Sequence, residues 1–217
     1  MPRRTISLPA ALVLFALIAP TVPAQAVVFS NFGVGDTYNI SGAAGVFGSG
    51  SGVGQTIRRA ASFIPATTTL LVDAQVPLSS STPTPDIRLS IIEDNAGSPT
   101  GATVQISGLS GITTRNIYTF TFTGNQTLVA GTRYWIVMEP LNPNGTLSLS
   151  WHYNTTGNQG YQSRFGTGAW QEPVPNTVPT MAYRINGTAV VVPEAGTLAL
   201  VGAGLAAFGA VVVRRRK

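Results

Sequence analysis

Apolar and polar residues alternate along much of the chain between residues 55 and 188. The clearest runs are Asp86 to Glu93 and Asn116 to Thr123, in which apolar side chains occupy every second position. A period of two is typical of a β-strand with one buried face. Further strands are predicted at residues 57–64, 67–76, 103–106, 133–139, 147–153 and 180–186.

Turn residues separate these runs. Asp94 to Pro99 follows one strand, and Asn142-Pro143-Asn144-Gly145 is typical of a hairpin turn. No apolar repeat of 3.6 residues occurs between Val27 and Val192. The pattern therefore predicts an all-β domain at residues 55–188, a single antiparallel β-sandwich of jelly-roll type with about nine short strands. Residues 27–54, with a glycine cluster at Gly42–Gly52, are predicted to form a Gly-rich leading segment with a flexible surface loop.

The first residues have the three parts of a secretory signal. A basic pair, Arg3-Arg4, precedes an apolar stretch from Leu8 to Ile18, and Ala24 and Ala26 form an Ala-x-Ala site. This order predicts a signal peptide at residues 1–26, with Ala24 and Ala26 recognised by signal peptidase. A first transmembrane helix is the alternative, which the short apolar stretch disfavours.

The last residues combine an apolar run with a basic tail. Residues 197–213 carry no charge, and a helix of this length is about 26 Å long, close to the lower limit for crossing a bilayer. A cluster of cations is retained on the cytoplasmic side of the membrane. The pattern predicts a transmembrane helix at 197–213 with its upstream domain outside. The predicted stop-transfer residues are Arg214, Arg215, Arg216 and Lys217.

A short motif precedes that helix, at Val192, Pro193 and Glu194. The motif, the apolar helix and the arginine cluster together resemble the PEP-CTERM sorting signal of Gram-negative bacteria that export exopolysaccharide. The resemblance covers residues 189–217 and implies an exosortase that recognises the Pro-Glu motif and cleaves nearby. Ala195 stands where the pattern usually has a second proline. An ordinary single-pass membrane anchor is the alternative.

The middle of the chain resembles the choice-of-anchor R group of extracellular domains. The resemblance rests on Ala61-Ser62-Phe63, on the strand Ile87 to Ile92 with its following turn, and on Gly131 to Val137. It implies an extracellular β-sandwich of no established activity.

The net charge of +5 comes from the two ends. Between Val27 and Val192 the seven arginines are balanced by seven acidic residues, so no basic surface for nucleic acid is expected. The arginines are at 58, 59, 88, 115, 133, 164 and 184, and the acids are Asp36, Asp73, Asp86, Glu93, Asp94, Glu139 and Glu172.

The sequence contains few residues that could carry out catalysis or bind a metal. The chain has no cysteine and one histidine, His152, which we expect to face solvent on a strand. A closed transition-metal site and a nucleophile with its base are therefore disfavoured, and no catalytic residue, metal or cofactor is predicted. Paired carboxylates for glycoside hydrolysis remain a weak alternative, with Asp86, Glu93, Asp94, Glu139 and Glu172 as the candidates. Glu93-Asp94-Asn95 offers oxygen ligands to Ca²⁺, although a simple turn is favoured.

Aromatic residues alternate with amides and glycines from Trp151 to Trp170. Core packing is favoured here, and a carbohydrate-contacting surface of Trp151, Tyr161 and Trp170 is the alternative. The patterns together predict an exported, non-enzymatic β-sandwich protein anchored in the inner membrane, and the PEP-CTERM resemblance implies that it is then passed to the cell surface or extracellular matrix of a Gram-negative bacterium. A carbohydrate-binding module for exopolysaccharide is the second hypothesis, and a glycoside hydrolase is a weaker third.

Overall fold

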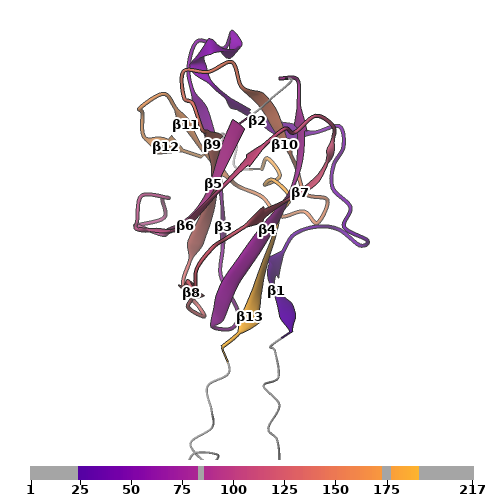
Figure 1. Ribbon diagram of the computed structural model, residues 1–217, viewed down its shortest axis with the longest axis vertical. Coiled ribbons are helices and arrows are strands. Elements are labelled where there is room, and N and C mark those ends of the chain that lie inside the picture. The colour runs from indigo at the N-terminus through magenta and orange to yellow at the C-terminus, as the bar shows by residue number, and fades with distance from the viewer. Residues whose placement is uncertain (1–23, 83–85, 173–176, 191–217) are drawn as a thin grey trace, which may run out of the picture.

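The computed structural model describes residues 24–82, 86–172 and 177–190, and their regular structure is β-strand apart from one 3-10 turn (Figure 1). The strands are β1 (Gln25–Ser30), β2 (Ala43–Phe47), β3 (Ile57–Phe63), β4 (Thr69–Ser80), β5 (Asp86–Glu93), β6 (Thr103–Ser110), β7 (Asn116–Thr121), β8 (Thr127–Leu128), β9 (Tyr134–Pro140), β10 (Ser148–His152), β11 (Gln162–Phe165), β12 (Trp170–Gln171) and β13 (Arg184–Ala189). The 3-10 turn, η1, is Ser49–Ser51. The predicted all-β, antiparallel fold is confirmed.

Hydrogen bonds join all thirteen strands into one antiparallel sheet, in the order β1-β13-β4-β10-β2-β3-β9-β5-β6. β7 and β8 pair with β4, β11 pairs with β3, and β12 pairs with β11. A single residue pair, Phe47 with Ile57, connects β2 to β3. Because this pair makes the sheet continuous, the finer prediction of a jelly-roll sandwich is not confirmed.

The sheet curls strongly around one core. Strands from distant places in the sheet order supply residues to the same buried cluster, among them Leu89 of β5, Met138 of β9 and Phe120 of β7. Trp151 of β10 and Tyr183, just before β13, are fully buried at its centre. Both polar tips are satisfied, since the indole N–H of Trp151 donates to the Ala182 carbonyl (2.8 Å) and the Tyr183 hydroxyl to the Ser62 carbonyl (2.6 Å).

β4 is longer than the sequence indicated. The strand predicted from the sequence ends at Val76, because Pro77 follows. In the structure β4 continues to Ser80. Pro77 falls between the stretch of β4 that pairs with β13, Thr69–Gln75, and the stretch that pairs with β10, Leu78–Ser80. A proline is tolerated there because its missing N–H interrupts no ladder on that edge.

The Gly-rich leading segment is part of the sheet, which corrects the expectation of a flexible loop. It contributes β1 and β2, and Ala44 and Val46 of β2 are buried in the core. Gly48 approaches the hairpin turn so closely that a Cβ atom there would lie 2.1 Å from the Gly145 carbonyl oxygen. Glycine is therefore required at this position by close packing, not by mobility.

The described chain begins and ends at the same pole. β1 pairs with β13, with Ala26 opposite Gly187, and Figure 1 shows the two strands side by side at the lower end. The buried Asp73 carboxylate of β4 accepts hydrogen bonds from the side-chain amides of Asn186 and Gln25, both at 2.6 Å. This contact ties three strands together at that pole.

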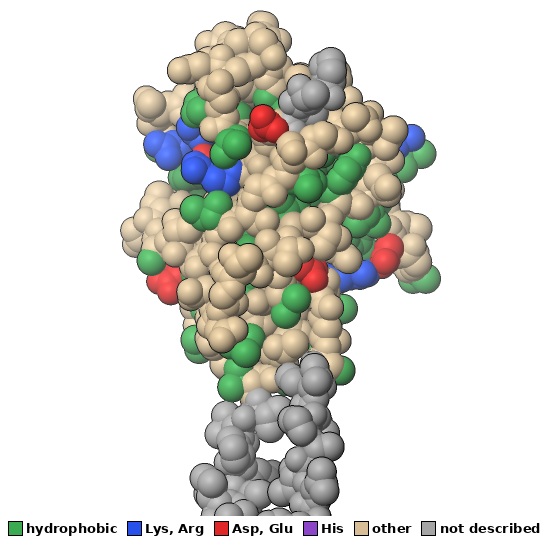
Figure 2. Space-filling model, in the orientation of Figure 1, with side chains coloured by type: hydrophobic (Ala, Val, Ile, Leu, Met, Phe, Trp, Pro, Cys, Tyr) green, Lys and Arg blue, Asp and Glu red, His purple; other side chains and the backbone are tan. Residues whose placement is uncertain are grey.

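The surface carries few charges, and Figure 2 shows them in small groups separated by uncharged surface. Arg184 with Asp36 is one such pair. Among the described residues no helix is long and apolar enough to cross a membrane. The predicted signal peptide up to residue 23 and the predicted helix at 197–213 lie outside the described residues.

Candidate functional site

The outer face of β3 and β9 carries a second, smaller apolar cluster. Trp135 and Val137 of β9 pair in register with Ser62 and Ala60 of β3, on the side opposite the main core. Ile92 and the half-buried ring of Trp170 pack against this cluster. Two indoles therefore lie on one outer face, where Trp135 is buried (5% exposed) and Trp170 is half-buried.

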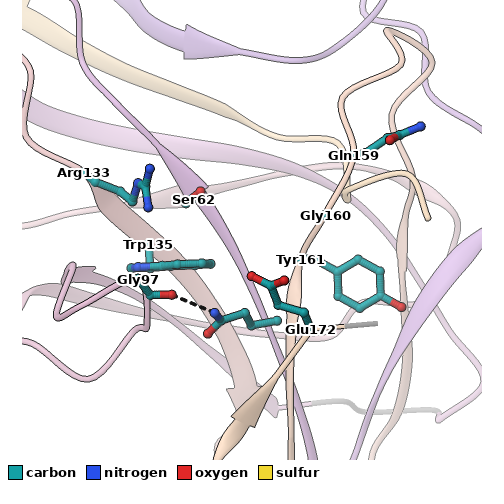
Figure 3. Close-up of a pocket in the computed structure, with 9 residues that line it drawn as sticks. Ser62, Gly97, Arg133, Trp135, Gln159, Gly160, Tyr161 and Glu172 are labelled. Carbon is teal, nitrogen blue, oxygen red and sulfur yellow. Dashed lines mark hydrogen bonds between the residues drawn. The ribbon is translucent and has the colours of Figure 1, made fainter. Parts of the chain in front are cut away.

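A pocket of about 240 Å³ opens beside Trp135 (Figure 3). In Figure 3 the Trp135 ring lies below Arg133, and the Glu172 carboxylate lies between Trp135 and Tyr161. The pocket combines one indole and one phenol ring with two amides, a serine hydroxyl and two charged groups, so its lining is mainly polar. It is lined by Ser62, Gly97, Arg133, Trp135, Gln159, Gly160, Tyr161, Gln162 and Glu172.

Hydrogen bonds hold the floor of the pocket in place. The indole N–H of Trp135 donates to Asp94 (2.6 Å), and the other carboxylate oxygen of Asp94 accepts from the Gly97 amide (3.1 Å). The Gly97 carbonyl in turn accepts from the Gln162 side-chain amide (2.8 Å). The turn that makes this possible has positive φ at Ala96 (53°) and Gly97 (82°). Trp135 and Gln162 are therefore fixed before any ligand arrives.

Arg133 differs from the other arginines of the described part of the chain. Each of the other six makes a side-chain hydrogen bond, as Arg115 does to the Ile40 carbonyl. The Arg133 guanidinium is exposed and makes no hydrogen bond or ion pair with any residue that the structure describes. The pocket thus contains an available cation.

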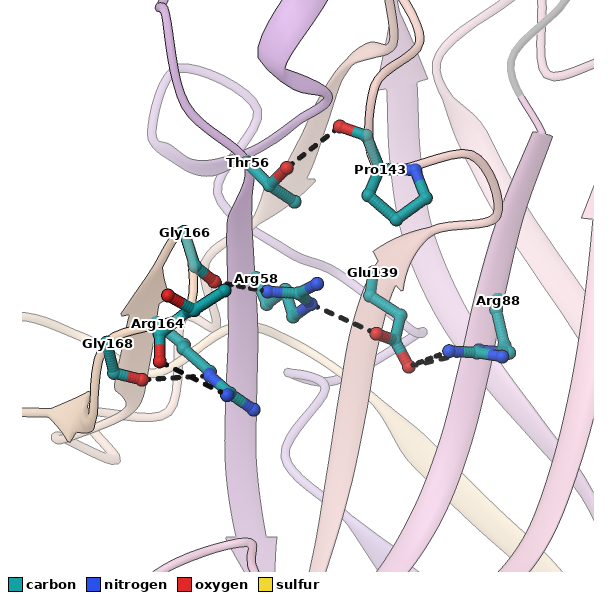
Figure 4. Close-up of polar contacts among 9 residues, drawn as sticks. Thr56, Arg58, Arg88, Glu139, Pro143, Arg164, Gly166 and Gly168 are labelled. Atoms are coloured by element: carbon teal, nitrogen blue, oxygen red, sulfur yellow. Dashed lines mark hydrogen bonds and ion pairs between the residues drawn. The ribbon is translucent and has the colours of Figure 1, made fainter.

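Glu139 lies on the same face but is fully engaged (Figure 4). Its two carboxylate oxygens bind Arg58 (3.1 Å) and Arg88 (2.9 Å), and Arg58 also donates to the Gly166 carbonyl (2.7 Å). Asp94, a second candidate acid for glycoside hydrolysis, is held by Trp135 and the following turn. These contacts give both carboxylates structural roles.

Asp94 was also part of the suggested calcium site, Glu93-Asp94-Asn95. In the structure this segment begins a turn in which the Asn95 and Ser98 backbones pair. No group of three or more potential metal ligands occurs within residues 24–82, 86–172 and 177–190. The segment therefore has a structural role, in which the Asp94 carboxylate holds the Trp135 indole.

His152 is buried, which corrects the prediction of a solvent-facing side chain. Its Nε2 lies 3.0 Å from the Ser79 hydroxyl of β4, and its Nδ1 lies 3.2 Å from the Asn39 carbonyl. The Tyr38 ring packs near the imidazole. No local pattern indicates this burial, because the loop that covers His152 comes from residues more than a hundred positions earlier.

The stability of the protein is expected to fall below about pH 6.5 because of His152. Burial lowers the pKa of His152, as does the nearby Arg115, and this outweighs the backbone carbonyls of Asn39 and Gly42. The unfolded chain then binds the proton more readily than the folded one, so acid favours unfolding. His152 is the only histidine. Urea unfolding between pH 7 and 5 should show a loss of stability that His152→Gln reduces, and an equal loss in that variant would contradict the assignment.

The three aromatic residues suggested for carbohydrate contact are not brought together on one surface. Trp151 has no exposed surface and lies in the core, so it cannot stack on a sugar, which corrects that part of the hypothesis. Tyr161 belongs to the same core, with the Arg59 guanidinium over its ring, and it closes one side of the pocket. Only Trp170 lies partly exposed on the outer face.

The two ends of the chain carry the remaining predicted sites. Ala24 and Ala26 are exposed; Ala24 lies just before β1, and Ala26 lies within it, opposite Gly187 of β13. Val192, Pro193, Glu194 and the tail Arg214–Lys217 lie outside the described residues.

Comparison with known families identifies the carboxyl-terminal segment. Residues 191–217 match the PEP-CTERM protein-sorting motif. The match implies that this is an exported protein processed by an exosortase, and it confirms the predicted sorting signal. No curated protein matches the chain. The resemblance of the β domain to the choice-of-anchor R group stays a prediction.

Proposed function

We propose that the chain is an exported β protein without catalytic activity, delivered to the cell surface or extracellular matrix of a Gram-negative bacterium through its sorting signal. The observation that carries the proposal is the PEP-CTERM motif at 191–217, which follows β13 (Arg184–Ala189) almost directly. The signal is thus attached at the pole where β13 pairs with β1.

The proposed sorting mechanism uses three parts of the signal. The apolar segment 197–213 forms a helix in the membrane, and the cations of Arg214–Lys217 stop translocation and remain in the cytoplasm. Pro193 and Glu194 then lie at the outer membrane face, where the exosortase recognises them. Cleavage releases the β domain from its inner-membrane anchor.

The absence of catalysis is supported by the contacts of the acid and base candidates. Glu139 is neutralised by two arginines, Asp94 supports an indole, and His152 is buried between Ser79 and a backbone carbonyl. Each of these three side chains is already engaged by other residues and is therefore not available to act on a ligand as an acid or base. A glycoside hydrolase is therefore not favoured over a binding or structural protein.

The full chain, expressed in a bacterium that has an exosortase, is expected to lose its tail. Mass spectrometry of the protein from the outer surface should find a carboxyl terminus near Glu194 and no Arg214–Lys217 tail. Glu194→Ala should leave the uncut chain in the inner membrane, because the recognised carboxylate is gone. Ala195→Pro is the matched control, since it restores the usual motif and should be processed at least as well. Recovery of an intact Lys217 from the surface fraction would overturn the proposal.

A further inference from the structure

We propose that the pole at which the described chain begins and ends docks on the lipid bilayer while the sorting signal anchors the protein. The side chains that enter the headgroup layer are Val190, Val129 and Ile64. This inference rests on the proposed sorting function, because the predicted helix at 197–213 supplies the anchor. It adds a lipid-contacting surface and a fixed orientation of the β domain before cleavage.

Strand pairing brings two of these side chains to the tip of the pole. Thr69, the first residue of β4, pairs with Ala189 of β13 on one side and with Leu128 of β8 on the other. Val190 and Val129 each follow their strand by one residue, so they extend past Thr69 on either side at the end of the sheet. Val190 is 38% exposed and Val129 is 50% exposed.

Ile64, which is 49% exposed, reaches the same tip from the loop between β3 and β4. Two hydrogen bonds hold this loop against the turn that follows β8. The Gly131 amide donates to the Pro65 carbonyl (2.9 Å). The Ala130 amide donates to the Thr68 hydroxyl (3.1 Å). A single exposed apolar residue is common on a protein surface, but several gathered in one place indicate a contact surface.

No charged side chain belongs to the segments that form this pole. Residues 25–30, 64–69, 127–132 and 185–190 contain no acidic or basic residue, and Figure 2 shows apolar and uncharged surface at the lower end of the molecule. A charged side chain there would oppose entry into the bilayer, because it must stay hydrated. Signal-peptide cleavage after Ala26 would add the ammonium group of Val27, whose charge suits anionic lipid headgroups.

The membrane is the occupant because of where the chain leaves the described structure. Residues 24 and 190 both lie at this pole, and each continues into a predicted membrane segment (Figure 1). Only residues 191–196 separate Val190 from the predicted helix, and these seven Cα steps span at most about 25 Å. The headgroup layer on each side of a bilayer is itself about 5–8 Å thick. The tip is therefore confined close to lipid.

This short tether makes a weak contact sufficient for docking. Confinement beside the bilayer gives the tip a high effective concentration, so half-exposed side chains bind lipid that they would not hold from free solution. Removal of the helix by the exosortase ends the confinement. Docking therefore orients the β domain before cleavage and does not retain it afterwards.

The test uses single cysteines, which the chain itself lacks, to carry a polarity-sensitive fluorophore. Val129→Cys places the probe at the tip. Leu141→Cys is the matched control, since Leu141 is similarly exposed (55%) and follows β9 at the end away from the pole. Each chain is purified uncut from the inner membrane of a host without an exosortase and reconstituted into vesicles of phosphatidylcholine and phosphatidylglycerol. A nitroxide on the lipid acyl chain should quench the probe at 129 and not the probe at 141.

Ile64→Asp should lower the ratio of docked to undocked molecules about tenfold, as measured by quenching of the probe at 129, because the new side chain does not leave water. Leu141→Asp adds the same charge at the other end and should leave this quenching unchanged. Both positions are exposed, so both variants are expected to fold, which circular dichroism checks.

The possible outcomes separate docking from sorting. Protein that floats with the vesicles while the probe at 129 is not quenched, or is quenched no more than the probe at 141, would overturn docking and leave the sorting proposal standing. Protein that does not float with the vesicles would overturn the anchor on which both proposals rest. Rapid disulfide cross-linking between copies of the unlabelled Val129→Cys chain, without quenching of the labelled one, would assign the surface to a second copy of this chain and also overturn docking on lipid.

Discussion

Trp151→Ala is expected to lower the free energy of unfolding by about 3–5 kcal/mol, out of the 5–15 kcal/mol typical of a domain. Trp151 is fully buried and its ring packs edge-on to Tyr183, with centroids 6.3 Å apart. Removing the indole leaves a cavity in the core beside Tyr183 and frees the Ala182 carbonyl from its hydrogen bond. The melting temperature should fall by about 10 °C, as followed by circular dichroism.

Trp151→Phe separates the two contributions. It keeps most of the ring volume but removes the N–H that donates to Ala182, so we expect a loss of about 1–2 kcal/mol. Trp151 offers no surface to a ligand, so both variants report on the stability of the core alone. A Trp151→Ala variant as stable as the wild type would show that the ring does not hold the core.

The strands with alternating pattern could be predicted from the sequence. β5 has Ile87, Leu89 and Ile91 fully buried, as the period of two requires. β7 likewise buries Phe120 while its threonines face outward. These patterns are local, so each strand is specified by its own residues. The way the strands combine is not local, and the continuous curled sheet depends on pairings such as Phe47 with Ile57 that no pattern indicates.

Glycine and histidine were the least predictable residues. β2 includes Gly45, and a segment rich in glycine has no hydrophobic period to distinguish a strand from a loop. His152 alternates with Trp151 on β10, so the pattern places it on the outer face, as observed. Its burial comes from a covering loop, which is a tertiary effect.

The candidate site was largely missed, although one signal was present. Tyr134-Trp135-Ile136-Val137-Met138 is a continuous apolar run, which indicates a strand covered on both faces. The structure supplies the cover for the outer face through Trp170 and Ile92. Arg133 and Gln162 meet there only because β11 pairs with β3, and sequence spacing cannot predict that pairing.

Asp73→Ala is expected to lower the free energy of unfolding by about 2–3 kcal/mol, the second largest effect proposed for this chain. Asp73 is buried and accepts from Asn186 and Gln25 at the pole where the chain enters and leaves the sheet. Without the carboxylate, the Asn186 amide stays buried with no acceptor, which costs more than the hydrogen bond itself contributed. Urea unfolding followed by tryptophan fluorescence measures the loss.

Cleavage after Ala26, where the signal peptide is predicted to end, would sharpen this experiment, because it would remove Gln25 and leave Asn186 as the side-chain donor to Asp73. The unprocessed chain should therefore lose more stability than the mature chain when Asp73 is replaced, by about one hydrogen bond, or 0.5–1.5 kcal/mol. Asp86→Ala, at the exposed start of β5, is the matched control and should change stability by less than about 0.5 kcal/mol. Equal effects of Asp73→Ala and Asp86→Ala would mean that the carboxylate does not join β1, β4 and β13. The attachment of the sorting signal to the sheet would then rest on backbone pairing alone.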